Sequence, residues 1–245
     1  MRLKVVAIIQ ARMGSNRLPG KVLKEIMNRP MLQYQIERMK RSETLDDIVI
    51  ATTTKEIDKA IVEFCQKLKI NYYCGSEDDV LARYYEAASK FHASVIVRIT
   101  SDCPIIDHRV IDKVVNYYLI EKEKYDYVSN TLERTFPRGM DTEVFSYKAL
   151  KEAHSGACMK FQREHVTPFI FQNPKRYRLA NITYLENLSH HRWTVDKMED
   201  LLLIKNIIEH IYPQKHDFSL EDTLEILNMF PEWSLLNNHI EQKKI

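Results

Sequence analysis

Residues that could bind an anion are concentrated in one short segment near the start of the chain. Residues 10–21 read QARMGSNRLPGK and follow the apolar run of residues 5–9. Gly14 and Gly20 allow the backbone to turn, so that its N–H groups can converge on an anion. The segment also holds Gln10, Ala11, Arg12, Ser15, Arg17 and Lys21. We therefore predict that these residues form a loop that binds polyphosphate.

This loop differs from the two common phosphate-binding motifs. Five residues separate Gly14 from Gly20, where a Walker A motif has four, and Val22 follows Lys21 in place of Ser or Thr. A G-x-G-x-x-G pattern is also missing, so a Rossmann dinucleotide site is not expected. The alternative is a solvated basic turn. A ligand site is favoured because open α/β sheets bind ligands where their parallel strands end.

Two aspartates follow predicted strands and could hold a cation. Asp102 comes just after the apolar strand 95–99, and Asp196 just after a strand predicted at 193–195. If both strands end at the same edge of the sheet, both carboxylates face one crevice. Mg²⁺ suits such a pair, because it takes few protein oxygens and completes its shell with water and substrate phosphates. The alternative role of each aspartate is to cap the next helix.

For three further charged residues the sequence leaves two roles open, contact with a ligand or pairing with another residue of the chain. Arg98 stands inside the strand 95–99, so it must either reach the crevice or find a partner. Asp79 and Arg83 lie in GSEDDVLARYYEA, residues 75–87. They either line the nucleotide site or form an exposed ion pair at spacing i, i+4.

Two polar segments in the middle of the chain supply candidate residues for an acceptor. Residues 136–143 read FPRGMDTE and residues 162–168 read QREHVTP. Arginine binds carboxylate or phosphate in bidentate fashion, so Arg138 and Arg163 are candidate anchors for an acidic group. The other residues that we assign to substrate binding are Arg98, Asp141, Glu143 and His165. A salt-bridge network that includes Glu143 and Glu164 is the alternative.

The apolar pattern predicts the elements that position these residues. Strands are expected at 5–9, 48–51, 70–74, 95–99 and 125–129, and helices with one apolar face at 32–39, 57–68, 80–88 and 110–118. This alternation predicts an α/β fold with a doubly wound, mostly parallel sheet. It fails at about 130–190, where we expect a subregion over the active edge. Helices at 198–211 and 220–230 follow, and we expect residues 1–245 to form a single domain.

Composition limits the partners and the location. The 36 basic and 34 acidic residues give a net charge of +2, so no broad basic face supports a nucleic-acid partner. The four cysteines show no CxxC pair or metal-ligand spacing, which indicates free thiols in a reducing cytoplasm; they are Cys65, Cys74, Cys103 and Cys158. The first apolar run is too short for a signal sequence, and no stretch is long enough to span a membrane.

The segment QARMGSNRLPGK resembles the N-terminal signature of the cytidylyltransferases that activate sugar acids, (P/Q)-A-R-x-x-S-x-R-L-P-G-K. Within that group the chain most resembles the spore coat polysaccharide biosynthesis type, from Val5 to about Ile211. The resemblance implies a nucleotide-diphospho-sugar transferase fold of GT-A-like type. It also implies a magnesium-dependent transfer of CMP from CTP to an acidic sugar-like acceptor, with release of pyrophosphate, and it is compatible with a homodimer.

The same resemblance suggests roles for individual residues. SDCP and VDKMED match the two stretches that hold the metal, which implies Asp102 and Asp196 as ligands, although Lys197-Met198 replaces the usual Thr-Pro. Arg12, Arg17 and Lys21 would hold the β and γ phosphates, and GSEDDVLARYYEA resembles the stretch beside the base and sugar. Related enzymes read the base with a Gln two residues before the metal-binding Asp. Thr100 stands there in this chain, so base selectivity stays open.

Two other functions remain as alternatives. A metal-dependent glycosyltransferase of similar fold would cleave a nucleotide sugar, but it should show D-x-D after a central strand, where this chain has Ser101-Asp102-Cys103. A catalytically idle nucleotide-binding protein would bind CTP and release no pyrophosphate. The spacing of His165, His190 and His191 matches no metal site, and the acceptor's identity does not follow from the sequence.

Overall fold

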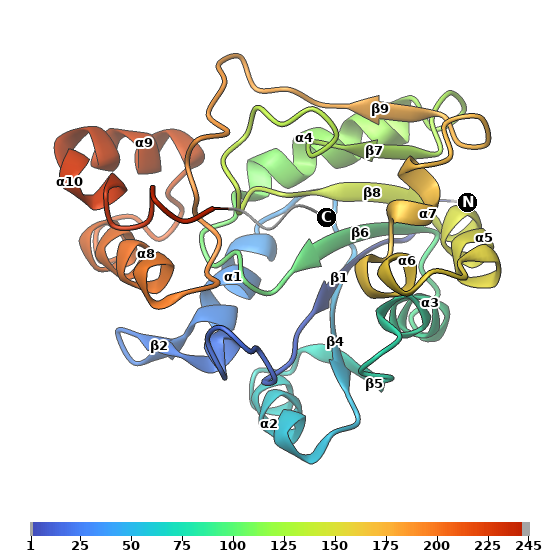
Figure 1. The fold of residues 1–245 in the computed structure, drawn as a ribbon, viewed down its shortest axis with the longest axis horizontal. Coiled ribbons are helices and arrows are strands. Elements are labelled where there is room, and N and C mark those ends of the chain that lie inside the picture. The colour runs from blue at the N-terminus through green and yellow to red at the C-terminus, as the bar shows by residue number, and fades with distance from the viewer. Residues whose placement is uncertain (1, 242–245) are drawn as a thin grey trace.

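One sheet of seven strands carries the core of the computed structural model, which describes residues 2–241 (Figure 1). In spatial order the strands are β5 (Asn71–Gly75), β4 (Asp47–Thr53), β1 (Val5–Gln10), β6 (Val95–Thr100), β8 (Glu143–Ser146), β7 (Tyr127–Ser129) and β9 (Leu179–Asn181). The first four are parallel to one another, β8 is antiparallel to both of its neighbours, and β9 is parallel to β7. The predicted fold class, α/β with a mostly parallel sheet, is confirmed.

Strand β1 is central because its side chains are buried on both faces of the sheet. Val5, Ala7 and Ile9 pack into one apolar cluster, and Val6 and Ile8 pack into the other. A strand covered on both sides has no need of alternating polar residues, which explains its continuous apolar sequence.

Helices cover both faces of the sheet (Figure 1). The larger apolar cluster takes residues from α1 (Met31–Met39), α2 (Lys59–Lys67), α4 (His108–Ile120), α8 (Met198–Ile211) and α9 (Leu220–Met229). The smaller cluster takes residues from α3 (Val80–Lys90), α5 (Tyr147–Gly156) and α7 (Pro168–Phe171). The remaining elements are η1 (Lys21–Leu23), β2 (Glu25–Ile26), β3 (Arg29–Pro30), η2 (Glu56–Asp58), α6 (Lys160–His165) and α10 (Pro231–Ser234).

The sequence-based prediction was wrong for two segments. Part of the region 130–190 enters the sheet, because β8 lies between β6 and β7. The strand predicted at 193–195 does not form. The Trp193 N–H donates to the Arg138 carbonyl, while the Val195 N–H donates to the Asp102 carbonyl. Because this extended segment pairs with two different neighbours, it makes one isolated bridge, from Arg138 to Arg192, in place of a ladder.

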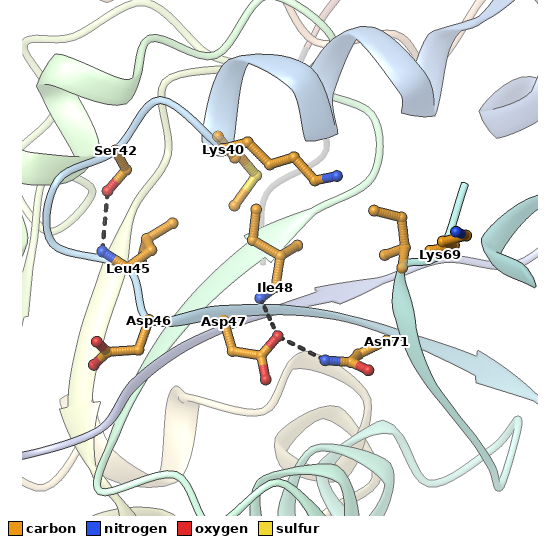
Figure 2. Close-up of a pocket in the computed structure, with 10 residues that line it drawn as sticks. Lys40, Ser42, Leu45, Asp46, Asp47, Ile48, Lys69 and Asn71 are labelled. Atoms are coloured by element: carbon orange, nitrogen blue, oxygen red, sulfur yellow. Dashed lines mark hydrogen bonds between the residues drawn. The ribbon is translucent and has the colours of Figure 1, made fainter.

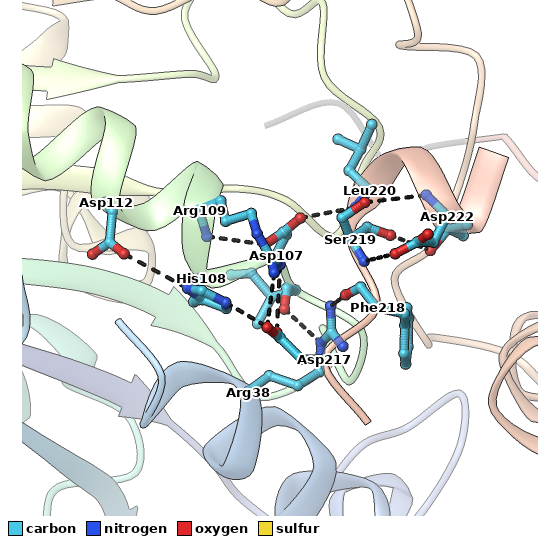
Figure 3. A network of polar contacts seen from close by, with 12 residues as sticks. Arg38, Asp107, His108, Arg109, Asp112, Asp217, Phe218, Ser219, Leu220 and Asp222 are labelled. Carbon is cyan, nitrogen blue, oxygen red and sulfur yellow. Dashed lines mark hydrogen bonds and ion pairs between the residues drawn. The ribbon is translucent and has the colours of Figure 1, made fainter. Parts of the chain in front are cut away.

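A buried polar network attaches the C-terminal helices to the sheet domain (Figure 3). The Arg38 guanidinium on α1 donates to the carbonyls of Ile106 and Phe218, at 2.7 and 2.8 Å. Its burial lowers the pKa of Arg38 to about 10. Asp107 accepts from the Leu220 N–H at 2.8 Å, at the start of α9. These contacts fix the segment after residue 216 against α1 and α4.

Two expectations from composition can be compared with residues 2–241. In this part of the chain no helix is both long and apolar enough to cross a membrane. The cysteines are free thiols, two buried, one half-buried and one exposed; they are Cys65, Cys103, Cys74 and Cys158, respectively.

Candidate active site

The segment after β1 forms a loop that is closed by its own backbone. The Met13 carbonyl accepts from the N–H groups of Ser15 and Gly20, both at 2.9 Å. Gly20 has φ 66°, a left-handed conformation that glycine adopts at little cost. Leu18 is buried and anchors the loop in the core. We call residues 11–20 the phosphate loop.

Lys21 lies immediately after this loop and bridges the two predicted metal ligands. Its Nζ is 3.0 Å from Asp102 Oδ2 and 2.9 Å from Asp196 Oδ1. It also donates to the Val195 carbonyl at 2.8 Å. Arg17 Nη2 lies 2.8 Å from the same Asp196 oxygen. The structure therefore brings two cations and two carboxylates together beside the C-terminal ends of β1 and β6.

The electrostatics of this cluster favour the charged forms. Burial alone would raise the pKa of Asp102, but the Lys21 ammonium outweighs it and lowers that pKa to about 2. Burial alone would lower the pKa of Lys21, but Asp102 and Asp196 outweigh it and raise that pKa. Lys21 and Asp102 are therefore an ion pair at neutral pH.

Asp196 is held in place by a second set of buried groups that the sequence analysis missed. Arg192 Nη2 donates to Asp196 Oδ2 at 3.1 Å, and Arg192 Nε donates to Asp200 Oδ1 at 2.8 Å. Asp200 in turn accepts from the N–H groups of Asp196 and Lys197, at 2.9 and 3.0 Å. The sequence feature that could have revealed this contact is Asp200, an acidic residue in the first turn of α8. A carboxylate at that position can accept hydrogen bonds from backbone N–H groups just before the helix. Asn237 donates to Asp200 Oδ1 at 2.9 Å.

Arg98 and Glu143 pair with each other across β6 and β8. Arg98 Nη1 forms an ion pair with Glu143 Oε2. Glu143 Oε1 accepts from the hydroxyls of Tyr127 and Thr167, at 2.6 and 2.8 Å. Arg98 Nη2 lies 3.4 Å from Gln10 Oε1. Both carboxylate oxygens of Glu143 are therefore occupied by partners within the chain, and the substrate contacts of Arg98 and Glu143 stay a prediction.

Asp79 and Arg163 also pair with each other, in place of the predicted partners. Arg163 Nη2 and Nε lie 2.5 and 3.0 Å from Asp79 Oδ2, and Arg163 Nη1 donates to the His154 carbonyl at 2.7 Å. The second Asp79 oxygen caps α3 by accepting from the Ala82 N–H at 2.9 Å. Burial raises the pKa of Asp79, but hydrogen bonds from Arg163 and Ala82 outweigh it, so that pKa is lowered. Arg163 thus joins α6 to the start of α3.

Arg83 points inward from α3 and has no carboxylate partner among residues 2–241. The side chain is 2% exposed and donates to the Ser76 carbonyl at 2.7 Å, while its Nε has no partner in that part of the chain. Burial lowers the pKa of Arg83. A buried cation paired only with a carbonyl suits a site for an anion. The exposed Asp79–Arg83 ion pair, which was the alternative to a nucleotide-binding role, does not form, because Asp79 pairs with Arg163 and Arg83 with the Ser76 carbonyl.

Glu77, in the middle of the GSEDD stretch of residues 75–79, contacts the phosphate loop. Arg12 Nη1 lies 3.5 Å from Glu77 Oε1, and Lys55 forms an ion pair with Glu77 Oε2. The Arg12 side chain remains 46% exposed, so this contact leaves it accessible to a ligand. Thr100 ends β6 beside Gln10, and its carbonyl accepts from Gln35 at 2.7 Å.

Arg138 differs from the other arginines of the region, because within residues 2–241 its guanidinium makes no hydrogen bond or ion pair. Its backbone is fixed, since the Arg138 N–H donates to the His191 carbonyl at 3.1 Å. Burial, followed by the nearby Arg134, lowers the pKa of Arg138. Asp141 does not neutralise it, because Arg134 binds both oxygens of Asp141 at 2.5 and 2.8 Å. Arg138 is therefore a half-buried cation available to an anion.

Gly139 allows the segment of Arg138 to approach residues 192–195 closely. Its φ is 104°, and a Cβ there would lie 2.8 Å from the backbone carbon and oxygen of Trp193. Neither condition suits another residue type. His165, the last of the predicted substrate residues, is half-buried at the end of α6.

A cavity lies at another edge of the sheet. A space of about 260 Å³ opens where β4 and β5 begin, among Lys40, Asp47, Lys69 and Asn71 (Figure 2). The Asp47 carboxylate there is occupied by the Ile48 N–H and by Asn71, both at 2.8 Å. The phosphate loop follows the C-terminal end of β1, which runs parallel to β4 and β5, whereas this cavity lies where β4 and β5 begin. The cavity is therefore separate from the charged cluster.

Comparison with known proteins agrees with this arrangement. The sequence model described as cytidylyltransferase matches residues 6–231. An uncharacterized protein of Methanocaldococcus jannaschii is 39% identical over 98% of this chain and 97% of its own length. The spore coat polysaccharide biosynthesis protein SpsF of Bacillus subtilis is 31% identical over 93% of this chain and 95% of its own length. A solved structure of a cytidylyltransferase from Leptospira borgpetersenii superposes with a TM-score of 0.91 at 31% identity, covering 99% of this chain and 100% of its own. The chain therefore belongs to the cytidylyltransferase family.

Proposed function

We propose that the protein transfers the cytidylyl group of CTP to an acidic sugar-like acceptor and releases pyrophosphate, in the synthesis of a surface polysaccharide. The observation that carries the proposal is the meeting of Arg17, Lys21, Asp102 and Asp196 at the C-terminal edge of the parallel strands, in a chain of this family. These residues come from three distant parts of the sequence, so we also propose that residues 1–245 act as one catalytic domain.

The phosphate loop supplies the contacts for the leaving group. Arg12 and Arg17 are about half exposed, so their guanidinium groups can reach the β and γ phosphates by exchanging their contacts with Glu77 and Asp196. The acceptor hydroxyl loses its proton to water and its oxygen attacks the α phosphorus. The new O–P bond forms while the bond from the α phosphorus to the oxygen that bridges to the β phosphate breaks, and pyrophosphate leaves with that oxygen. The protein contributes position and charge neutralisation, and needs no covalent nucleophile.

The carboxylates of Asp102 and Asp196 fit a magnesium ion. Asp102 Oδ2 and Asp196 Oδ1 lie within 3.0 Å of one point, the Lys21 Nζ, so a single cation can contact both. Within residues 2–241 no group of three or more acidic, His or Cys side chains is placed to hold a metal, so the proposed ion would take these two carboxylates and complete its shell with water and substrate phosphates, as Mg²⁺ does. When bound there, Mg²⁺ would neutralise charge on the CTP phosphates. Lys21 would then exchange its carboxylate contacts for phosphate oxygens.

Arg138 is the residue that we assign to the acidic group of the acceptor. It is half-buried and unpaired within the described chain, and a desolvated arginine without an anion is unfavourable. Arg163, the other candidate anchor, is bound to Asp79 and would have to leave that carboxylate to reach the acceptor, whereas Arg138 would not.

A pyrophosphate-release assay tests the proposal. The purified protein is incubated with Mg²⁺, each of the four nucleoside triphosphates, and a panel of sugar acids with their amides. Release that depends on CTP and on a carboxylate acceptor supports the assignment. Binding of CTP without release in any combination would instead favour an idle nucleotide-binding protein, and preference for another triphosphate would contradict CTP as the substrate.

A further inference from the structure

Asp58 lies directly beneath the phosphate loop and is buried, at 1% exposure. Its Oδ1 accepts from the Met13 N–H at 2.6 Å, and its Oδ2 accepts from the Thr53 hydroxyl. Thr53 is the last residue of β4. A single carboxylate therefore connects the end of β4 to the middle of the loop.

The usual reason for an aspartate before a helix does not apply here. Asp58 precedes α2, but its side chain makes no capping hydrogen bond to that helix. Both of its oxygens face the loop side, toward Met13 and Thr53. The position of this carboxylate therefore requires another explanation than helix capping.

Met13 takes part both in the closure of the loop and in its attachment to the residues beneath it. Its carbonyl closes the turn by accepting from Ser15 and Gly20, and its N–H is bound by Asp58. Arg12 precedes Met13 directly, so the direction in which Arg12 leaves the loop depends on the same peptide group. Fixing Met13 therefore orders the backbone N–H groups and the cations of the loop together.

The negative charge of Asp58 makes its burial beneath the loop unfavourable unless it serves a purpose there. A buried carboxylate under an anion-binding loop repels the ligand, and its burial is unfavourable unless its oxygens are well satisfied. A hydrogen bond from an N–H to a carboxylate is about twice as strong as one to a neutral acceptor. We infer that Asp58 is a positioning residue that holds Met13, and thereby the phosphate loop, in the conformation that binds the phosphates of CTP. This inference rests on the proposed function of the loop.

Three variants separate positioning from stability. Asp58→Ala leaves the Met13 N–H without its acceptor. Asp58→Asn keeps an oxygen for Met13 and can donate its amide to Thr53. Thr53→Val removes the hydroxyl from the same carboxylate and leaves the Met13 bond intact, which makes it the matched control. For each protein, the dissociation constant of CTP with Mg²⁺ is measured by calorimetry, and stability by thermal unfolding.

We expect Asp58→Ala to weaken CTP binding by roughly 10-fold or more, the scale of losing one hydrogen bond to a charged group. Asp58→Asn and Thr53→Val should stay within about threefold of wild type, although Thr53→Val also lowers the unfolding temperature. Equal weakening by Asp58→Ala and Thr53→Val would overturn the inference, and so would unchanged binding by Asp58→Ala. If Asp58→Ala does not fold, Asp58→Ser, which is too short to bridge Met13 and Thr53, carries the same expectation.

Arg12→Ala distinguishes this inference from the proposed function beneath it. If Arg12→Ala and Lys21→Ala both leave CTP binding unchanged, the loop is not the phosphate site and both ideas fall. If Arg12→Ala weakens binding while Asp58→Ala does not, only the role of Asp58 is wrong. Weakening by both, with rescue by Asp58→Asn, supports both.

Discussion

The two sides of the candidate site hold their charges in different ways. On the phosphate side, Arg17, Lys21, Asp102 and Asp196 are paired with one another. On the acceptor side, Arg138 has no partner within residues 2–241, although Arg134 and Asp141 are paired beside it. A ligand on the phosphate side must replace contacts within the chain, whereas an anion on the acceptor side adds a contact that the chain lacks.

This difference has energetic consequences. A ligand that displaces an existing ion pair gains less net free energy than its short contacts suggest. The two charges of that pair already compensate each other for the cost of burial. Neutralising a lone, half-buried guanidinium offsets a desolvation penalty that the protein otherwise carries. We therefore expect the phosphate side to depend on a cation that competes with Lys21, and the acceptor side to discriminate sharply by charge. The following experiments test each half of that contrast.

Removal of the metal should have the largest effect. EDTA should abolish pyrophosphate release and added Mg²⁺ should restore it. Asp102→Asn and Asp196→Asn should each raise the Mg²⁺ concentration needed for half-maximal rate, because an amide keeps the oxygen but loses the charge. A Mg²⁺ titration of the three proteins measures this. A variant that keeps full activity at low Mg²⁺ would remove its residue from the metal site.

Loss of a loop cation should have the next largest effect. Arg12→Ala and Lys21→Ala should each slow turnover by about 10²-fold, the scale of one preorganised charge contact in a catalytic site. Steady-state kinetics with varied CTP measures the change, and circular dichroism controls for folding. Wild-type rates and CTP affinity in both variants would refute the phosphate assignment.

Arg163→Met should change stability and leave the acceptor KM unchanged. The variant removes the two hydrogen bonds to Asp79 and the one to the His154 carbonyl, so the free energy of unfolding should fall by about 1–2 kcal/mol. Urea denaturation measures this loss. An increase in acceptor KM without any loss of stability would return Arg163 to the acceptor site.

The smallest effect concerns pH on the acceptor side. Burial, with a further contribution from His190, lowers the pKa of His191 to about 4. The unfolded chain therefore binds a proton at His191 at a higher pH than the folded chain does, so stability falls as pH decreases from about 6.5 to 4. His191→Gln should reduce this acid-induced loss of unfolding free energy by an amount on the order of 1 kcal/mol, because the half-buried ring is partly screened by solvent. Denaturation curves at pH 7 and pH 4.5 test it, and identical pH dependence in both proteins would contradict it.

Elements with a strong apolar period were predictable from the sequence. Helix α8 has the expected bounds, and β1 is the buried strand that its unbroken apolar run predicts. Strand β8 was missed because Glu143–Ser146 is short and its polar ends have partners that its own sequence does not reveal: Glu143 pairs with Arg98 of β6, and Ser146 caps α5. The predicted strand at 193–195 was wrong because its two apolar residues are buried by packing rather than by membership of a ladder.

The same distinction applies to the site. The position of Asp102 follows from local sequence, since Asp102 comes just after the buried strand β6. That of Lys21 does too, since Lys21 ends the loop that follows the buried strand β1. The pairing of Arg163 with Asp79 joins residues 84 positions apart, and that of Asp58 with Met13 joins residues 45 positions apart. Nothing in either segment specifies its partner, because the pairing is created by the packing of α6 on α3 and of the phosphate loop on β4.

The most direct test of the account compares an acid with its amide as the acceptor. The ratio of kcat/KM for a sugar acid to that for its amide is measured with CTP for wild type, Arg138→Met and the matched control Arg163→Met. We predict a large ratio in wild type and in Arg163→Met, and a ratio at least 10-fold smaller in Arg138→Met, because a buried arginine left unpaired is costly. Equal use of acid and amide by the wild-type protein would contradict the assignment of an acidic acceptor.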